Sequence, residues 1–188
     1  MTTSVAGTRY VIDTRTSQFT VQAFASGLIS AIAHSPKIAI RDWSGMVQMI
    51  SGSLEGASLK ARVKPASLEV LDELPDADRR ELHRIMNQEV LETPDFPEII
   101  YDGTMAAERL KEDLFRLNVR GRLTLHGITN DQDFVAQASL GVDSARAYGS
   151  FTLLQSDYNI RIASIAGGTL KLQDELKFSF YVVARKAD

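Results

Sequence analysis

The sequence predicts a mainly β protein whose strands form one antiparallel barrel, with one helix over roughly residues 76–91. Three observations support this fold class. Apolar and polar residues alternate with a period of two through most of the chain, turn residues separate the alternating stretches, and only one segment has helical spacing. Strands with one apolar face form a sheet that curls over that face, and a closed barrel leaves no unpaired edge. A two-layer sandwich is the alternative.

The longest alternation covers residues 115–126 and corresponds to about 38 Å of strand at the usual rise per residue. One of its faces is apolar and carries Phe115, Leu117, Val119, Leu123 and Leu125. Similar alternation predicts strands over residues 58–64 and 176–182. Shorter strands are predicted over 9–13, 18–25, 37–42, 45–50, 97–105, 132–141, 145–155 and 158–164.

The helix is predicted from a change of period after Pro75. One face then carries Leu82, Ile85, Met86, Glu89 and Val90. Asp76 or Asp78 can cap the start, and Thr93 ends the helix because a residue before proline avoids helical geometry. A single helix in a β chain usually covers an open end or a gap of a barrel, and we expect it there.

Composition limits the classes of function. The 188 residues fit a single domain, which we expect to span residues 1–188. The net charge of −3 argues against a nucleic-acid partner, because phosphate binding requires a concentrated basic surface. The chain has no cysteine, which excludes disulfides, thiolate catalysis and cysteine-ligated zinc.

Residues 16–36 carry no charged side chain and raise the question of a targeting segment. Within them, Ala31-Ile32-Ala33 resembles the small-residue cleavage site of a signal peptide. Phe19, Val21 and Ala23 nevertheless alternate with polar residues as a strand does, and the run is too polar for a membrane-spanning helix. We therefore expect a cytoplasmic protein with no integral membrane segment, rather than a periplasmic or secreted one.

Motifs for catalysis or cofactor binding are absent from the sequence. It has no G-x-S-x-G, no P-loop, no G-x-G-x-x-G and no H-E-x-x-H, so neither a cofactor nor a metal site is predicted. The three histidines lie far apart in the chain. His83 is expected on the exposed side of the helix, and His126 on the polar face of its strand, where it could bond a neighbouring loop. His34 follows the uncharged segment and could lie at a barrel mouth.

Four stretches, in order, resemble the YceI-like family. Residues 10–21 resemble its opening strand, and residues 86–101, MNQEVLETPDFPEIIY, resemble the end of its helix and the entry to the next strand. Residues 121–129, GRLTLHGIT, fit the pattern G-x-L-T-[LI]-x-G-[VI]-T, in which a strand leads into a turn. Residues 174–178 resemble the closing strand. The similarity extends over nearly the whole chain.

The resemblance implies a bacterial protein with a lipocalin-like barrel of about eight strands around a tubular apolar cavity. It implies a non-catalytic role in which the cavity holds a long isoprenoid or a similar amphiphilic lipid. A barrel of this size has room for one slender ligand, and burying the five carbons of an isoprene unit contributes several kcal/mol. The chain departs from the family at residues 23–26, where a histidine is common. It departs again at Gln155 and Asn159, where arginine and glycine are common.

The predicted lining is the set of apolar residues on inward strand faces: Phe19, Val21, Leu59, Val63, Leu117, Val119, Leu123, Phe178 and Phe180. Other hypotheses stay open. The same side chains could fill a solid core, with the protein acting through its surface in stress response or assembly. Alternatively, the protein could be an enzyme in which His34 or a carboxylate acts at the barrel mouth. A homodimer fits each hypothesis.

Overall fold

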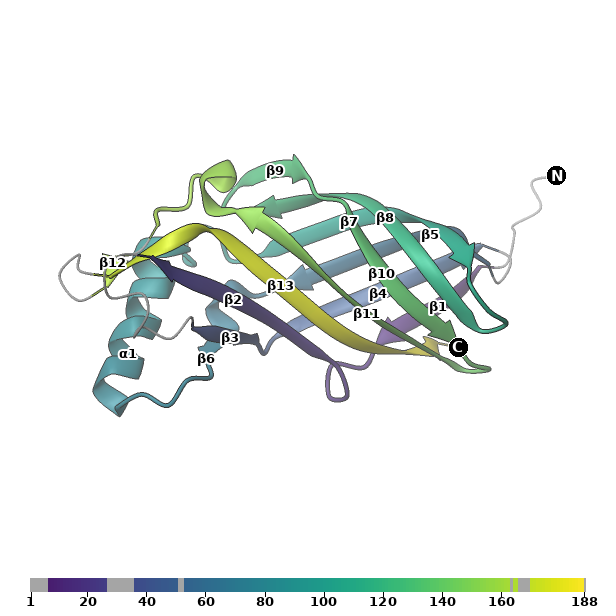
Figure 1. Cartoon of the computed structure of the whole chain (residues 1–188), viewed down its shortest axis with the longest axis horizontal. Coiled ribbons are helices and arrows are strands. Elements are labelled where there is room, and N and C mark those ends of the chain that lie inside the picture. The colour runs from purple at the N-terminus through teal and green to yellow at the C-terminus, as the bar shows by residue number, and fades with distance from the viewer. Residues whose placement is uncertain (1–6, 27–35, 51–52, 163, 166–169, 188) are drawn as a thin grey trace.

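The computed structural model describes residues 7–26, 36–50, 53–162, 164–165 and 170–187. Its strands pair into one antiparallel sheet. They are β1 (Thr8–Ile12), β2 (Gln18–Ser26), β3 (Lys37–Ile40), β4 (Trp43–Ile50), β5 (Ser53–Val63), β6 (Leu68–Val70), β7 (Ile99–Arg109), β8 (Leu114–Leu125), β9 (Ile128–Asp131), β10 (Phe134–Leu140), β11 (Ser144–Leu154), β12 (Ser164–Ile165) and β13 (Leu170–Ala187). Figure 1 shows a tube with helix α1 (Asp76–Ile85) at one end and β1 and the end of β13 at the other.

The barrel closes because the last strand pairs with the first. β13 pairs with β11 on one side, and with both β1 and β2 on the other. β1 and β2 therefore act as two segments of one barrel strand. β4 pairs with β1 and β3 pairs with β2, so β3 and β4 are two segments of the next barrel strand. β5 pairs with β4 and β6 pairs with β3, so β5 and β6 are two segments of the strand after it. With β7, β8, β10, β11 and β13, these segments form the closed eight-stranded antiparallel barrel that was predicted, and the sandwich alternative is wrong.

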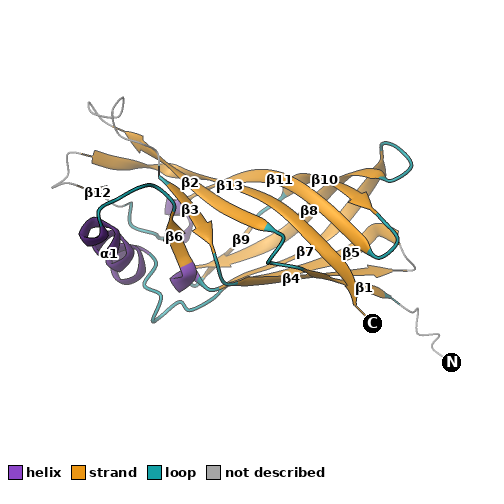
Figure 2. Cartoon of the chain, turned by 90° about the horizontal axis from the view of Figure 1, so that it is seen from below, coloured by secondary structure: helices purple, strands orange, loops and turns teal. Residues whose placement is uncertain are grey.

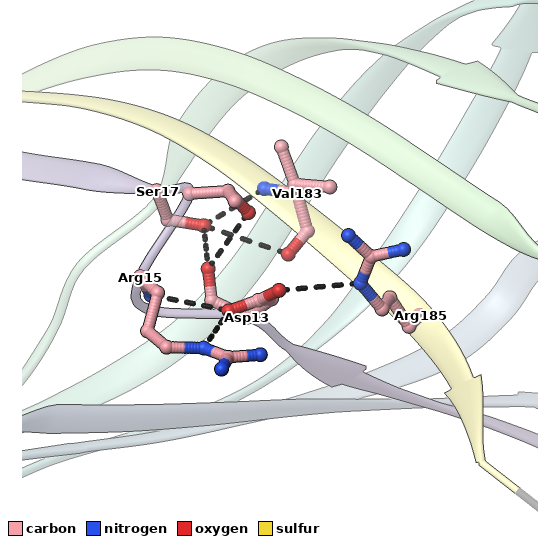
Figure 3. A network of polar contacts seen from close by, with 6 residues as sticks. Asp13, Arg15, Ser17, Val183 and Arg185 are labelled. Carbon is pink, nitrogen blue, oxygen red and sulfur yellow. Dashed lines mark hydrogen bonds and ion pairs between the residues drawn. The ribbon is translucent and has the colours of Figure 1, made fainter.

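The hinge between β1 and β2 is held against β13 by a polar network (Figure 3). The Ser17 hydroxyl donates to the Asp13 carbonyl at 2.7 Å and accepts from the Val183 amide at 2.9 Å. The Asp13 carboxylate accepts from the Arg185 Nε at 3.2 Å and also from Arg15. The Arg185 hydrogen bond lowers the pKa of Asp13, with smaller contributions from Arg15. The barrel strand can therefore bend here without leaving its neighbour.

A gap opens in the barrel wall at the α1 end. β5 pairs with β7 as far as Val63 and Ile99, whereas β6 pairs only with β3 among the described strands. The chain between β6 and β7 forms α1 and then a π-helical turn, η2 (Met86–Val90). Figure 2 shows α1 beside β6 at this end. The helix thus lies where it was predicted, at an open end of the barrel.

Arg79 attaches α1 to the barrel. Its guanidinium donates to the backbone carbonyls of Val70 at 2.9 Å and Asp72 at 3.2 Å. The helix has no side-chain cap, because Pro75 occupies the N-cap position, so the predicted cap from an aspartate is wrong. No helix in the described ranges is long and apolar enough to cross a membrane.

The strand predicted over residues 158–164 is wrong. Gln155–Tyr158 form a short 3-10 helix (η3), and Asn159 turns the chain in the left-handed region at φ 53°. Tyr158 and Ile160 are buried on either side of the exposed Asn159, so a turn produces the same alternation as a strand. Among the described residues of this segment, Ser164 begins a two-residue strand with Ile165 that pairs with β13.

Candidate functional site: the barrel cavity

A cavity of about 720 Å³ lies inside the barrel. Its wall consists of the inward faces of the barrel strands, together with the inward side of α1 and η2. All nine side chains that the sequence predicts for the lining border it: Phe19, Val21, Leu59, Val63, Leu117, Val119, Leu123, Phe178 and Phe180. They come together because alternate residues of every strand face the same side.

The cavity reaches α1 at one end. There its border includes Leu82 and Ile85 of the helix, which are only half-buried, and three acidic side chains at the rim: Asp72, Asp78 and Glu81. α1 contributes no fully buried residue. The helix therefore covers this end without a buried seal of its own, and Asp78 and Glu81 at the rim are exposed.

The opposite end is lined by buried residues of β1, β4 and β5. β4 runs from Trp43, next to β3, towards Met49, which pairs with the start of β1. Met49 is 2% exposed and Leu54 is 7% exposed, so this end is well enclosed. The cavity thus has a rim at α1 and a deep end beside β1. Figure 1 shows these two elements at opposite ends of the barrel.

A chain of aromatic rings in mutual contact lines part of the cavity wall. Phe151 stacks on Phe178 with ring centroids 4.9 Å apart, and Phe134 lies 5.5 Å from Phe151. Phe19 makes edge contacts with Phe178 and with Trp43, at 6.2 and 5.6 Å. Phe134, Phe151 and Trp43 were missed as lining residues, although the first two lie in stretches with the strand period.

Tyr101 is a large polar residue of the cavity wall, and two glycines make room for its ring. Its ring lies over two cross-strand partners, Gly103 and Gly121, where a Cβ atom at Gly121 would approach the Tyr101 hydroxyl to 2.4 Å. The hydroxyl donates to the Gln132 carbonyl at 3.0 Å. Burial raises the pKa of Tyr101, and the nearby Asp133 adds to this effect, so the phenol stays protonated at neutral pH.

The histidines do not meet at the cavity. His34 lies outside the described residues, so its predicted place at the mouth stays a prediction. His83 is exposed on α1, as expected. His126 lies just beyond β8, and its ring bonds the Tyr158 carbonyl at 3.1 Å and the Glu92 carboxylate at 2.9 Å. The predicted bond to a neighbouring loop is confirmed, but the side chain is only 10% exposed because it packs on Phe96.

No group of histidine and carboxylate side chains among the described residues is arranged to hold a metal ion. The wall instead offers an apolar surface with a few buried polar atoms. Such an arrangement suits the burial of a hydrocarbon chain, with orientation set by a small number of hydrogen bonds.

Solved structures share this fold. BcnA of Burkholderia cenocepacia is 14% identical, with a TM-score of 0.68 over 92% of this chain and 98% of its own. A polyisoprenoid binding domain from Saccharophagus degradans, implicated in plant cell wall breakdown, is 13% identical, with a TM-score of 0.69 over 95% and 98%. The Campylobacter jejuni YCEI protein is 16% identical, with a TM-score of 0.57 over 83% and 88%.

No curated protein sequence matches the chain. The structural similarities, at these identities, establish the fold alone. The sequence evidence is independent of them and covers almost all of the barrel, since the model of the YceI-like domain matches residues 10–184. The chain belongs to the YceI-like family.

Proposed function

We propose that this protein binds and carries a long hydrophobic amphiphile, an isoprenoid or similar lipid, inside its barrel, and that it is not a catalyst. The observation that carries the proposal is the apolar cavity of about 720 Å³ inside the barrel. A domain of this size normally has a closely packed interior with few voids larger than a water molecule. A cavity this large is hard to explain unless something occupies it.

Two further points support a lipid-like ligand. The protein belongs to the YceI-like family, and a structural neighbour is a polyisoprenoid binding domain. The cavity is also of the right size: a cavity of about 150 Å³ holds a benzene molecule, so this one has room for about 29 carbons. That is between five and six isoprene units.

Hydrophobic burial alone gives such a chain high affinity. Each buried carbon contributes about 0.8 kcal/mol, so even a partly buried chain offsets the cost of immobilising it. No reactive group is needed for this. The solid-core hypothesis is disfavoured by the cavity, and no arrangement of the described side chains favours the enzyme hypothesis over binding.

A charge placed on the wall tests the proposal. Val119 is 2% exposed and faces the cavity, whereas Val135, on the neighbouring β10, is 51% exposed and faces outward. Val119→Arg should abolish binding because a guanidinium inside the cavity keeps its hydration water, and an apolar ligand could enter only at the high cost of removing that water. Val135→Arg should bind as the wild type does.

The assay uses the single tryptophan, Trp43, which lies on the cavity wall. A prenylated quinone that enters the barrel should quench its fluorescence. The proposal predicts saturable quenching in the wild type and in Val135→Arg, and none in Val119→Arg, while circular dichroism shows all three folded. Equal quenching in both variants, or no quenching in the wild type, would refute the proposal.

A further inference from the structure

Four polar side chains on the cavity wall are at least nine-tenths buried: Tyr10, Trp43, Tyr101 and Gln155. Two of them are satisfied by the protein itself. Tyr101 donates to the Gln132 carbonyl at 3.0 Å, and the Gln155 amide donates to the Gln173 carbonyl at 3.0 Å. Buried donors normally have a partner, because an unmade hydrogen bond inside a protein costs free energy.

Tyr10 and Trp43 are different. Neither the Tyr10 hydroxyl nor the Trp43 indole N–H bonds any described residue. Every fully enclosed side-chain nitrogen or oxygen in the described ranges does have a partner, so these two atoms must border open space. Tyr10 is only 7% exposed and Trp43 only 9%, and the open space that both border is the cavity.

The two donors lie at different depths. Trp43 packs with Ile40 and Val63, the last residues of β3 and β5. Figure 1 shows β3 on the side of α1. Tyr10 faces inward from the middle of β1, opposite Val47, at the end of the barrel away from α1 (Figure 1). A ligand that enters past α1 therefore meets Trp43 first and reaches Tyr10 last.

We propose that the ligand enters with its polar end first, and that an uncharged oxygen acceptor at this end takes a hydrogen bond from the Tyr10 hydroxyl. This inference rests on the proposed function and narrows the ligand class to isoprenoid or acyl chains that carry a carbonyl or quinone oxygen. A charged head group fits the deep end poorly. The cationic side chain on the described wall, Arg146, is exposed, and a buried anion without a buried counterion is costly.

The hydrogen bond makes the cavity selective. A hydrocarbon that fills the deep end leaves the Tyr10 hydroxyl dry and unpaired, whereas a carbonyl oxygen satisfies it. One such bond strengthens binding by about 2- to 12-fold in Kd. Tyr10→Phe removes only the hydroxyl, so the selectivity should vanish while the shape of the cavity is retained.

The test compares a tetraprenyl ketone with the hydrocarbon of the same skeleton. The wild type should bind the ketone more tightly, and Tyr10→Phe should weaken ketone binding by about 2- to 12-fold without weakening hydrocarbon binding. Retained hydrocarbon binding shows that the variant is folded. The matched control is Tyr148→Phe, on the outward face of β11, where the side chain is 52% exposed; it should change neither affinity.

Infrared spectroscopy supplies a second readout. The carbonyl stretch of the bound ketone should lie at lower frequency in the wild type than in Tyr10→Phe. An unchanged ketone affinity and stretch in Tyr10→Phe would overturn the inference and leave the carrier function standing. An effect of Trp43→Phe in place of Tyr10→Phe would also overturn it, because the acceptor would then lie nearer the rim. If neither compound binds the wild type, the proposed function itself fails.

Discussion

Filling part of the cavity should shorten the longest chain that the protein can bury. Ala147 is half-buried on β11, between Ala138 of β10 and Val182 of β13, and its methyl group borders the cavity. Ala147→Phe adds one phenyl ring on this wall. The partners on both neighbouring strands are of small or moderate size, so the ring has to point into the open interior.

The size of the effect follows from volumes. A benzene-sized ring occupies about 150 Å³, which is about a fifth of the cavity. The same scaling assigns the wild type about 29 carbons, so the variant should lose about six of them, slightly more than one isoprene unit. Affinity should rise with each unit that is buried and stop rising when further units remain in water.

The assay is the Kd of a homologous series of prenylated quinones, measured by quenching of Trp43 fluorescence. The wild-type series should reach a plateau at five to six units, and the Ala147→Phe series about one unit earlier. The control is Ser150→Phe, on the outward face of the same strand, which should leave the plateau unchanged.

The free energy of unfolding of Ala147→Phe distinguishes a hollow barrel from a filled core. In a hollow barrel the new ring enters free space, and the free energy of unfolding of Ala147→Phe should equal or exceed that of the wild type. In a filled core, the same overpacking would cost about 1–3 kcal/mol. A loss of that size, together with an unmoved plateau, would show that the interior has no room for a ligand.

Two further predictions concern the parts that hold the barrel together. His126→Asn keeps a residue that tolerates the left-handed backbone but removes the ring that bonds Tyr158 and Glu92, so chemical denaturation should show a loss of about 1–3 kcal/mol with ligand affinity unchanged. Arg185 lowers the pKa of Asp13 below its ordinary 3.8, so this ion pair stabilises the fold above that pH, and the contribution is lost as the pH falls through the lowered value. Asp13→Asn should therefore lower the melting temperature at neutral pH, and the difference from the wild type should vanish in strong acid; a difference that persists there would contradict this assignment.

The strand period was sufficient to predict the barrel and nine of the apolar side chains that border its cavity, although Phe134, Phe151 and Trp43 were missed. Along β8, the alternation from Phe115 to Leu125 records which side chains face inward, and no long-range information is needed for that. The helix at the open end was predictable for the same reason, because its period differs from that of its surroundings. The strand predicted over residues 158–164 was wrong because Tyr158 and Ile160 are buried at a turn, two residues apart, which is also the spacing of a strand.

The features that could not be predicted depend on contacts between residues that lie far apart in the chain. The environment of His126 depends on Glu92 and Phe96, which reach it only in the folded chain. Whether a polar group of the cavity finds a hydrogen-bond partner depends on such contacts even more. Tyr10 and Tyr101 have the same side chain on the same type of strand, yet among the described residues Tyr101 has a backbone carbonyl as its partner and Tyr10 has none. The sequence contains both tyrosines and does not distinguish their roles.

The most direct test of the central claim is native mass spectrometry of the protein purified from its own host, followed by lipid extraction. A bound mass of isoprenoid or acyl type that carries an oxygen acceptor is the expected result. A protein that remains at its apo mass, and takes up no added prenylated quinone, would contradict it.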